Sequence, residues 1–378
     1  MRIAQVAPPF QSVPPLGYGG TERVVSLLTE ELIRRGHDVT LYASGDSQTA
    51  ARLVPTVDTA LWRTNDVREP LPFLTATASL AFRAAARGDF DIVHSHLDFH
   101  GFTGASLVKT PTVTTLHGRL DLPELPYLYS QFPDVSVVSI SESQRLALPQ
   151  ARWAGTVYNA VDVDRLQYHP NGGRYLAWLG RISPDKGLDR AIRIARLAGL
   201  PLKIGARLPL EDLADPSVRA DWDYYRERVK PLLREPGIEF VGEVAERDKA
   251  EFLGNALALL NPITWPEPFG LVMAEALACG TPVIARRRGA APEVVTHGLT
   301  GLIGDSDEEI AGLCGHVQQM SRAACRREAV RRFSPQVMVD GYEAIYRAFA
   351  GALPGATERG TPDAPPRTNG LRREAFAR

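Results

Sequence analysis

The stretch WPEPFGLVMAEALACGTPV, from Trp265 to Val283, contains a proline-rich loop, an apolar helical segment and the start of an apolar strand. Prolines on both sides of Glu267 predict a fixed, non-helical loop, and Gly270 lets the chain turn tightly into the helix. The apolar run LALLNP precedes this stretch and TPVIA overlaps its end. Strand, helix and strand in this order are typical of a parallel βαβ unit.

The same alternation extends in both directions along the chain. In the first half the strand-like runs are IAQVA (3–7), DVTLYA (38–43), DIVHS (91–95), PTVTTL (111–116) and VSVVSI (135–140). In the second half they are RYLAWL (174–179), PLKIG (201–205), IEFVG (238–242), LALLNP (257–262) and TPVIA (281–285). Helical patterns separate them, so the sequence predicts an α/β protein with two Rossmann-like, doubly wound domains.

Several helices have recognisable ends. ERVVSLLTEELIRRG (22–36) has apolar residues at helical spacing and stops at Gly36. Ser141 and Gln144 form a capping-box pattern at the start of a helix. After Gly187 we expect an amphipathic helix whose apolar residues are Leu188, Ile192, Ile194 and Leu197. The segment 333–351 is expected to form a final helix.

The expected domains follow from these elements. Gly172 and Gly173 lie in a polar, breaker-rich stretch that marks a domain boundary. We expect a first domain over 1–168, a second over 169–335 and a terminal helix over 336–351. The segment 352–378 is rich in Pro, Gly and charge, with few residues to bury, and we expect it to be disordered.

The composition of the chain limits the classes of partner that it is expected to bind. The chain has 378 residues, 44% hydrophobic and 23% charged, with a formal net charge of -1. This balance gives no support for nucleic acid or a membrane surface as the main partner. Three cysteines form no paired spacing, which favours a reducing cytoplasm. No run is long enough to span a membrane, and the first apolar run breaks at Pro8-Pro9, too early for a signal peptide.

The unusual residues all fall where strands are expected to end. In open α/β sheets, ligands bind beyond the carboxyl ends of the strands. The residues at those positions are Gly17 to Gly20, His117 with Gly118, Arg181 to Lys186, Glu267 and Glu293. Scattered structural residues would not be expected to share one edge.

Glu267 and Glu275 flank the start of one helix, whose free N–H groups can bind an anion. A sugar nucleotide fits this pattern, with Glu267 on the sugar hydroxyls and Glu275 on the ribose. The alternative is a solvated loop charge at Glu267 and a helix-dipole partner at Glu275. Arg181 and Lys186 share one strand-to-helix loop and suit a diphosphate leaving group, which favours the functional interpretation over two solvated charges.

Weaker candidates lie in the first half. Gly19 and Gly20 allow close approach to phosphate, although a plain tight turn would use the same residues. His117 is a candidate sugar contact or a satisfied core histidine. His94, His96 and His100 suggest a metal site, but only Asp98 accompanies them. We therefore expect a packing and hydrogen-bonding set and no metal.

Taken together, these motifs resemble the bacterial family-4 glycosyltransferases, which are retaining enzymes of the GT-B fold. The resemblance rests, in chain order, on GYGGTERVV, TLHG, SISES, YNAVDVDRL, LGRISPDKG, FVGEV, EPFGLVMAEALACGTPVIA and GAAPEVVTHGLTGLI. It covers the chain up to about Gly351. It implies that the two domains face each other across a cleft and that the terminal helix crosses back to the first domain.

The resemblance also implies roles. Arg181 and Lys186 would bind the donor diphosphate, Glu267 the donor sugar and Glu275 the ribose, while His117 would face the sugar. Val244 would flank the nucleobase, and Glu293 would order its loop. The backbone that would meet sugar and phosphate is that of Phe269, Gly270, Leu271 and Val272, with Gly19 and Gly20 lining the phosphates.

The family implies no metal and no cofactor, with UDP-hexose as the first donor to test and an unidentified glycan, lipid or small-molecule acceptor. One departure lies after the strand PLKI, where the family often has an open glycine pair and this chain has Gly205-Ala206-Arg207. Acceptor contacts would lie in first-domain loops, where Tyr127 and Tyr129 either stack on a ring or pack. Contact with a membrane surface is left open.

Three alternatives share parts of this pattern. A nicotinamide-dependent oxidoreductase needs a Gly-x-Gly-x-x-Gly motif directly after the first strand, where this chain has Pro8-Pro9. A nucleotide-sugar epimerase and a non-catalytic sugar-nucleotide-binding protein both remain open at this point.

Overall fold

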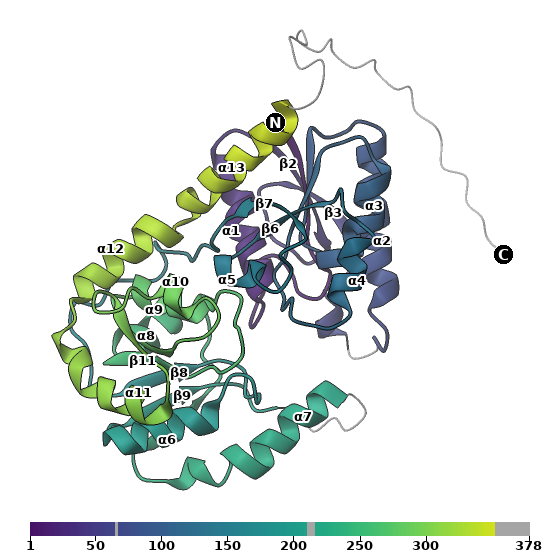
Figure 1. Cartoon of the computed structure of the whole chain (residues 1–378). Helices are drawn as coiled ribbons and strands as arrows, with labels where there is room; N and C mark the ends of the chain where they lie inside the picture. Colours follow the sequence, from purple (N-terminus) through teal and green to yellow (C-terminus); the bar gives the residue numbers. More distant parts are fainter. Residues whose placement is uncertain (65–66, 210–215, 352–378) are drawn as a thin grey trace.

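The computed structural model of the protein describes residues 1–64, 67–209 and 216–351. Two parallel sheets, each flanked by helices, follow one another along this part of the chain (Figure 1). The predicted two-part α/β architecture is therefore confirmed. The expected disordered segment at 352–378 lies outside the described residues.

The first sheet has the strand order β3-β2-β1-β4-β5-β6-β7, and all its pairs are parallel. The order reverses between β1 and β4, which makes that junction the switch point of the sheet. Its strands are β1 (Arg2–Val6), β2 (Asp38–Ser44), β3 (Arg52–Val57), β4 (Ile92–Ser95), β5 (Thr112–Thr115), β6 (Ser136–Ser139) and β7 (Arg152–Thr156).

The second sheet has the order β10-β9-β8-β11-β12-β13, again with parallel pairs. Its switch point lies between β8 and β11, which pair through Leu176 and Ala177 of β8. Its strands are β8 (Leu176–Leu179), β9 (Leu202–Gly205), β10 (Ile238–Gly242), β11 (Ala258–Asn261), β12 (Val283–Arg286) and β13 (Gly301–Gly304).

Helices connect most of the successive strands, although β3 follows β2 directly. In the first half they are α1 (Gly20–Arg34), α2 (Leu71–Ala86), α3 (Phe102–Leu107), α4 (Leu125–Ser130) and α5 (Glu142–Arg145). In the second half they are α6 (Leu188–Ala198), α7 (Pro216–Tyr224), α8 (Lys249–Gly254), α9 (Leu271–Ala278), α10 (Ala291–Val294) and α11 (Asp307–Leu313). The last described helices are α12 (Arg322–Phe333) and α13 (Pro335–Gly351). Short 3₁₀ or π segments lie at Leu61–Arg63, Asp98–Gly101, Tyr225–Val229, Leu232–Arg234 and Cys314–Gln319.

Three strands escaped sequence analysis, and each lies at the edge of a sheet. β3 and β7 are half-exposed along their length, so they lack the continuous apolar run of a buried parallel strand. β13 has the sequence GLIG, in which glycines replace half of the side chains that would give a strand signal.

Two helix predictions need correction. Leu197 was expected on the buried side of α6, but it is 58% exposed because the buried stripe runs through Leu188, Ile192 and Ile194. The capping box is only half formed. The Ser141 hydroxyl accepts from the Gln144 backbone N–H, but the Gln144 side chain accepts from Ile140 instead of returning to Ser141.

The terminal helix α13 packs against the first half of the chain. Figure 1 shows α12 and α13 as two consecutive rods, with α12 over the second half and α13 beside α1. Tyr342 and Tyr346 of α13 are fully buried in the same core cluster as Ile3 of β1 and Ile92 of β4. Helix α13 therefore forms part of the core of the first half.

The three cysteines are unpaired and buried, in keeping with the expectation of no disulfide framework. Among the described residues, none of the helices combines the length and apolar character needed to cross a membrane.

Candidate functional site

A carboxylate and an ammonium group, from the loops that follow two neighbouring strands, meet at the switch point of the second sheet. Lys186 lies in the loop between β8 and α6, and Glu267 lies in the loop between β11 and α9. The Lys186 Nζ is 2.5 Å from the Glu267 Oε2, and the two side chains are only 18% and 14% exposed. The structure thus brings together two of the four charged groups selected from the sequence.

The loop that carries Glu267 is held from behind. Gly289 has a left-handed φ of 53°, and a Cβ there would lie 2.4 Å from both the backbone N and the backbone O of Glu267. The Ala290 N–H also donates to the Glu267 carbonyl at 2.9 Å. Only glycine at 289 permits this contact, so the segment before α10 fixes the position of the Glu267 backbone.

No side chain caps the N-terminus of the helix that follows this loop. Gly270 caps α9 in a left-handed conformation with φ 80°, and no side chain accepts a hydrogen bond at this cap. The Phe269 ring does not face the cleft, because it is 2% exposed and packs against Tyr158 and Phe333. At this position the backbone, including that of Leu271 and Val272, remains the group available to a ligand.

Arg181 lies on the same loop as Lys186 but is held loosely. Its side chain is 54% exposed, with guanidinium nitrogens 3.6 Å from Asp221 and 3.9 Å from Asp185. Both distances are longer than a hydrogen bond. Arg181 can therefore move towards an anionic ligand at little cost.

Trp265 and Arg119 are part of the site but were not selected from the sequence. The Lys186 Nζ lies 5.4 Å and the Arg119 Cζ 5.6 Å from the centre of the Trp265 ring. One cation comes from each half of the chain, so the Trp265 ring contacts both halves. Trp265 stands in the decisive stretch, but no local signal connects it with Arg119.

Glu275 belongs to a second charge network. It is 6% exposed, and its Oε1 accepts from the Lys249 Nζ at 2.7 Å. Lys249 also lies 2.9 Å from Glu246, which lies 3.0 Å from Arg23 of α1. Burial alone would lower the pKa of Lys249, but Glu275 and Glu246 raise it above its usual value, so the lysine remains charged.

The glycine loop before α1 meets the second half of the chain. A Cβ at Gly20 would lie 3.3 Å from Leu271, at the start of α9, and a Cβ at Gly19 would lie 2.7 Å from Pro15. Close packing thus requires glycine at 19, whereas a Cβ at 20 would need a small shift of the Leu271 side chain. The neighbouring Glu22 is 5% exposed, and burial raises the pKa of its carboxyl to about 7.

His117 sits on a turn that is clamped from both sides. The Asp98 carboxylate accepts from the His117 backbone N–H at 3.1 Å. The Gln144 amide donates to the carbonyls of Leu116 and Gly118, each at 2.9 Å. Burial lowers the pKa of the His117 ring to about 4, so the ring is neutral at pH 7.

The neighbouring histidines form the expected packing and hydrogen-bond set. His94 bonds to Tyr346 and Thr115, His96 bonds to Gln5 and His117, and the His100 ring stacks on Phe99. No group of three metal-ligating side chains occurs in the part of the chain that the structure describes.

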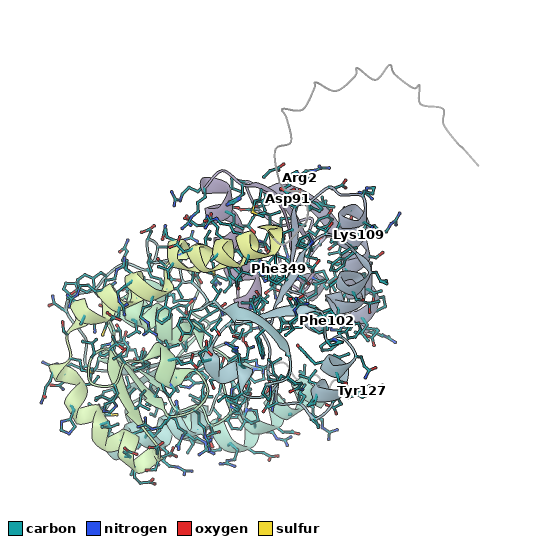
Figure 2. The ribbon with its side chains drawn as sticks, turned by 45° about the horizontal axis from the view of Figure 1, so that its top comes forward. Arg2, Asp91, Phe102, Lys109, Tyr127 and Phe349 are labelled. Carbon is teal, nitrogen blue, oxygen red and sulfur yellow. The ribbon has the colours of Figure 1, made fainter. Side chains whose placement is uncertain are left out.

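Other predicted residues have clear positions. Val244 packs against Gly205. A Cβ at Gly205 would lie 2.7 Å from the Val244 Cγ2, so this close contact requires glycine at 205. Tyr129 is buried and packs edge-on against Phe102 at 5.2 Å, whereas Tyr127 on the same helix is 73% exposed (Figure 2). Of the two tyrosines, only Tyr127 is free to stack on a ligand.

Glu293 connects the two halves. Its carboxylate accepts from the backbone N–H groups of Glu142 and Ser143 at 2.8 and 2.7 Å and from the Tyr158 hydroxyl at 3.1 Å. A side chain of the second half therefore caps α5 of the first half, which agrees with the ordering role expected for Glu293.

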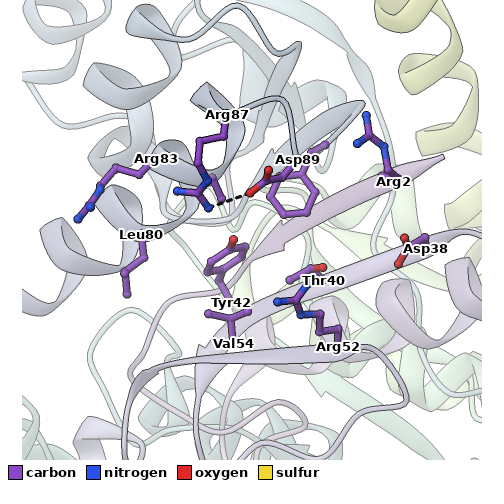
Figure 3. A pocket seen from close by; sticks show the side chains of 12 residues that line it. Arg2, Asp38, Thr40, Tyr42, Arg52, Val54, Leu80, Arg83, Arg87 and Asp89 are labelled. Carbon is purple, nitrogen blue, oxygen red and sulfur yellow. Dashed lines mark hydrogen bonds and ion pairs between the residues drawn. The ribbon is translucent and has the colours of Figure 1, made fainter. Parts of the chain in front are cut away.

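Two hollows lie away from this edge, at the amino ends of the strands. One of about 370 Å³ lies between the end of α2 and strands β2 and β3, with Tyr42, Arg52 and Arg83 among its walls (Figure 3). Another of about 610 Å³ lies beside Gly172 and Pro201 in the second half. Neither includes the charged groups described above.

Comparisons with known proteins agree with this geometry. The family model for glycosyl transferases group 1 matches residues 167–332, and that for glycosyltransferase family 4 matches residues 18–165. The phosphatidyl-myo-inositol mannosyltransferase of Mycolicibacterium smegmatis is 28% identical over 93% of this chain and 95% of its own length. The N-acetyl-alpha-D-glucosaminyl L-malate synthase of Bacillus anthracis is also 28% identical, over 89% and 94%.

A solved structure shows the same fold. Anabaena HepE in complex with UDP-glucose superposes with a TM-score of 0.69 and 19% identity, over 92% of this chain and 100% of HepE. The two consecutive family models, the full-length relatives and the paired parallel sheets lead to one conclusion. The chain belongs to the family-4 glycosyltransferases and has the GT-B fold.

Proposed function

We propose that this glycosyltransferase moves a hexose from a nucleoside-diphosphate sugar to an acceptor hydroxyl, with retention of configuration and without a metal ion. The contact between Lys186 and Glu267 carries the proposal, because it places a cation and a carboxylate together at the switch point of the donor-side sheet. A diphosphate sugar needs both charges at one place.

Arg181, Lys186 and the N-terminus of α9 would hold the diphosphate. Negative charge grows on the leaving phosphate as the bond to the sugar breaks, and fixed cations and N–H groups stabilise that charge. Lys186 would exchange its carboxylate partner for the diphosphate, and Arg181 would leave its loose contacts with Asp185 and Asp221.

The carboxylates would hold hydroxyl groups. Glu267, released by Lys186, would accept from the hexose hydroxyls. Glu275 uses one oxygen for Lys249, and its second oxygen has no hydrogen-bond partner among the residues described, so it is available to the ribose. His117 would face the sugar, Val244 the base, and Gly19 with Gly20 the phosphates.

The configuration at the anomeric carbon is retained if the acceptor hydroxyl attacks the sugar from the same face as the departing phosphate. The leaving phosphate oxygen then takes the proton of the acceptor hydroxyl, and the protein contributes mainly positioning and charge stabilisation. No protein side chain has to act as a nucleophile in this scheme.

UDP-glucose is the first donor to test, because HepE was solved in complex with it. The named relatives act on phosphatidyl-myo-inositol and L-malate, so the acceptor panel should include an inositol lipid in vesicles, inositol phosphate and malate. A lipid acceptor would bring the first half of the chain to a membrane surface.

The experiment combines binding and turnover. Thermal shifts with a set of nucleotide sugars select the donor, and mass spectrometry with the acceptor panel detects the product. Lys186→Ala and Glu267→Ala should each lower kcat by roughly 10²- to 10³-fold, as expected for a fixed group that stabilises transition-state charge. Activity of the wild type should persist in EDTA.

Lys203→Ala is the matched control. Lys203 is also a cation of the second sheet, but it lies within β9 and pairs with Glu239 at 3.1 Å, away from the carboxyl edge. Full activity in both site variants would refute the assignment. Conversion of the donor sugar without any acceptor would indicate epimerisation instead.

A further inference from the structure

A continuous hydrogen-bonded chain connects the terminal helix α13 with His117. The Gln5 amide nitrogen of β1 donates to the Tyr346 hydroxyl at 3.2 Å, and its oxygen lies 2.8 Å from the His96 Nε2. The His96 Nδ1 lies 2.9 Å from the His117 Nε2. Gln5, His96 and Tyr346 are each no more than 1% exposed, so no water competes for these groups.

The direction of the bonds in this chain follows from the orientation of the Gln5 amide, whose nitrogen faces Tyr346 and whose oxygen faces His96. An amide oxygen can only accept, so the His96 Nε2 must carry the ring proton. Burial lowers the pKa of the His96 and His117 rings, and a neutral imidazole has one N–H group. The His96 Nδ1 is therefore an acceptor, and the His117 Nε2 must donate to it. The remaining nitrogen of His117, Nδ1, is left as a bare acceptor.

The same chain continues from Tyr346 in the other direction, away from His117. The Tyr346 hydroxyl lies 2.6 Å from the His94 Nδ1. The His94 Nε2 lies 2.7 Å from the Thr115 hydroxyl, which lies 2.9 Å from the Tyr342 hydroxyl. Tyr346 donates to His94 and accepts from Gln5, which keeps the amide nitrogen of Gln5 turned towards α13.

We propose that Gln5 and Tyr346 are positioning residues that, through His96, hold His117 in the tautomer whose bare Nδ1 accepts a hydroxyl hydrogen bond from the donor sugar. The contact of His117 with the sugar rests on the proposed function; the tautomer does not. The Nδ1 has no hydrogen-bond partner among the residues that the structure describes, which leaves it available to a ligand. The terminal helix thus acts on the site as well as on the core.

The tautomer can be measured directly. Two-bond ¹H–¹⁵N spectra of protein labelled at histidine, without donor, should show His117 protonated at Nε2 in the wild type. Gln5→Met removes the acceptor for His96 and should convert His117 to a mixture or to the Nδ1-protonated form. The KM for the donor should then rise roughly fivefold, the effect of one neutral hydrogen bond, with a smaller change in kcat.

Two further variants keep the test decisive. Tyr346→Phe deletes one oxygen and should shift the tautomer in the same direction even if Gln5→Met folds poorly. Tyr342→Phe is the matched control, because it deletes the same group from the same helix at the far end of the chain, where the Thr115 hydroxyl can still accept from the His94 Nε2. It should leave the tautomer unchanged and the KM within twofold of the wild type.

Nδ1 protonation in the wild type, or an unchanged tautomer in Gln5→Met and Tyr346→Phe, would overturn the proposal. A shifted tautomer with an unchanged KM for the donor would overturn its connection with the sugar. Absence of transfer from every nucleotide sugar would refute the proposed function instead, and it would leave the spectroscopic result standing.

Discussion

Replacing Glu293 by alanine tests whether one carboxylate holds the two halves of the chain together. The change removes three hydrogen bonds, from the Glu142 and Ser143 backbone N–H groups and from the Tyr158 hydroxyl. Two N–H groups at the start of α5 then lose a charged acceptor. The same change leaves the backbone of both halves untouched.

The magnitude follows from the kind of bond lost. Substituting a helix-capping acceptor by alanine costs about 1 kcal/mol, and a hydrogen bond to a charged group contributes about 1.5–3 kcal/mol. The Glu142 N–H is exposed and can turn to water, so the lower part of this range applies to it. We expect Glu293→Ala to lower the free energy of unfolding by about 2–3 kcal/mol.

Urea unfolding at pH 7, followed by circular dichroism, measures this loss. Glu142→Ala is the matched control, because its side chain is 60% exposed and makes only a surface pair with Arg145 at 3.2 Å. That variant should lose no more than about 0.5 kcal/mol. If Glu293→Ala loses as little as Glu142→Ala, the hydrogen bonds of Glu293 with the first half do not stabilise the fold.

Two other predictions concern Glu22 in the first turn of α1 and Gly289 behind the Glu267 loop. Burial raises the pKa of the Glu22 carboxyl from 4.5 to about 7, so the folded chain keeps a proton that the unfolded chain has lost, and stability falls as the pH rises through this window. Glu22→Gln should therefore gain up to about 3 kcal/mol over the wild type at pH 8 and almost nothing at pH 4.5, as measured by urea unfolding; an equal difference at both pH values would contradict this. Gly289→Ala should cost about 1–3 kcal/mol and lower transfer by displacing Glu267, because a Cβ there would meet that backbone at 2.4 Å. Gly298→Ala, at a glycine with φ 81° and no atom within 4 Å, should share the backbone strain but keep its activity, and equal activities of the two variants would argue against the steric cause.

The central strands could be predicted from sequence because their burial is a local property. A parallel strand covered on both faces is a nearly continuous apolar run, as in LAWL of β8 and ALLN of β11, and such a run is visible in a few residues. The edge strands β3, β7 and β13 are defined by the neighbour they pair with, which a local pattern does not contain. Sequence therefore predicted the middle of each sheet better than its borders.

The same distinction applies to the site. Lys186 and Glu267 were selectable because each lies in a short loop directly after a buried strand, and both strands lie at the switch point. The charge network of Glu275 was not, since its partner Lys249 lies on another helix and connects through Glu246 to Arg23 of the first half. A charge can be located from local pattern, but its partner depends on tertiary folding.

The pairing of the charges has a consequence for how the proposed reaction begins. Lys186 and Glu267 neutralise each other, so neither is buried as an isolated charge. A diphosphate carries more negative charge than one carboxylate and can displace it from Lys186. The displaced Glu267 then gains a free oxygen beside the position where the sugar would lie. In the proposed reaction, binding of the diphosphate and recognition of the sugar would thus be one exchange of partners, for which Lys186 and Glu267 must lie on adjoining loops.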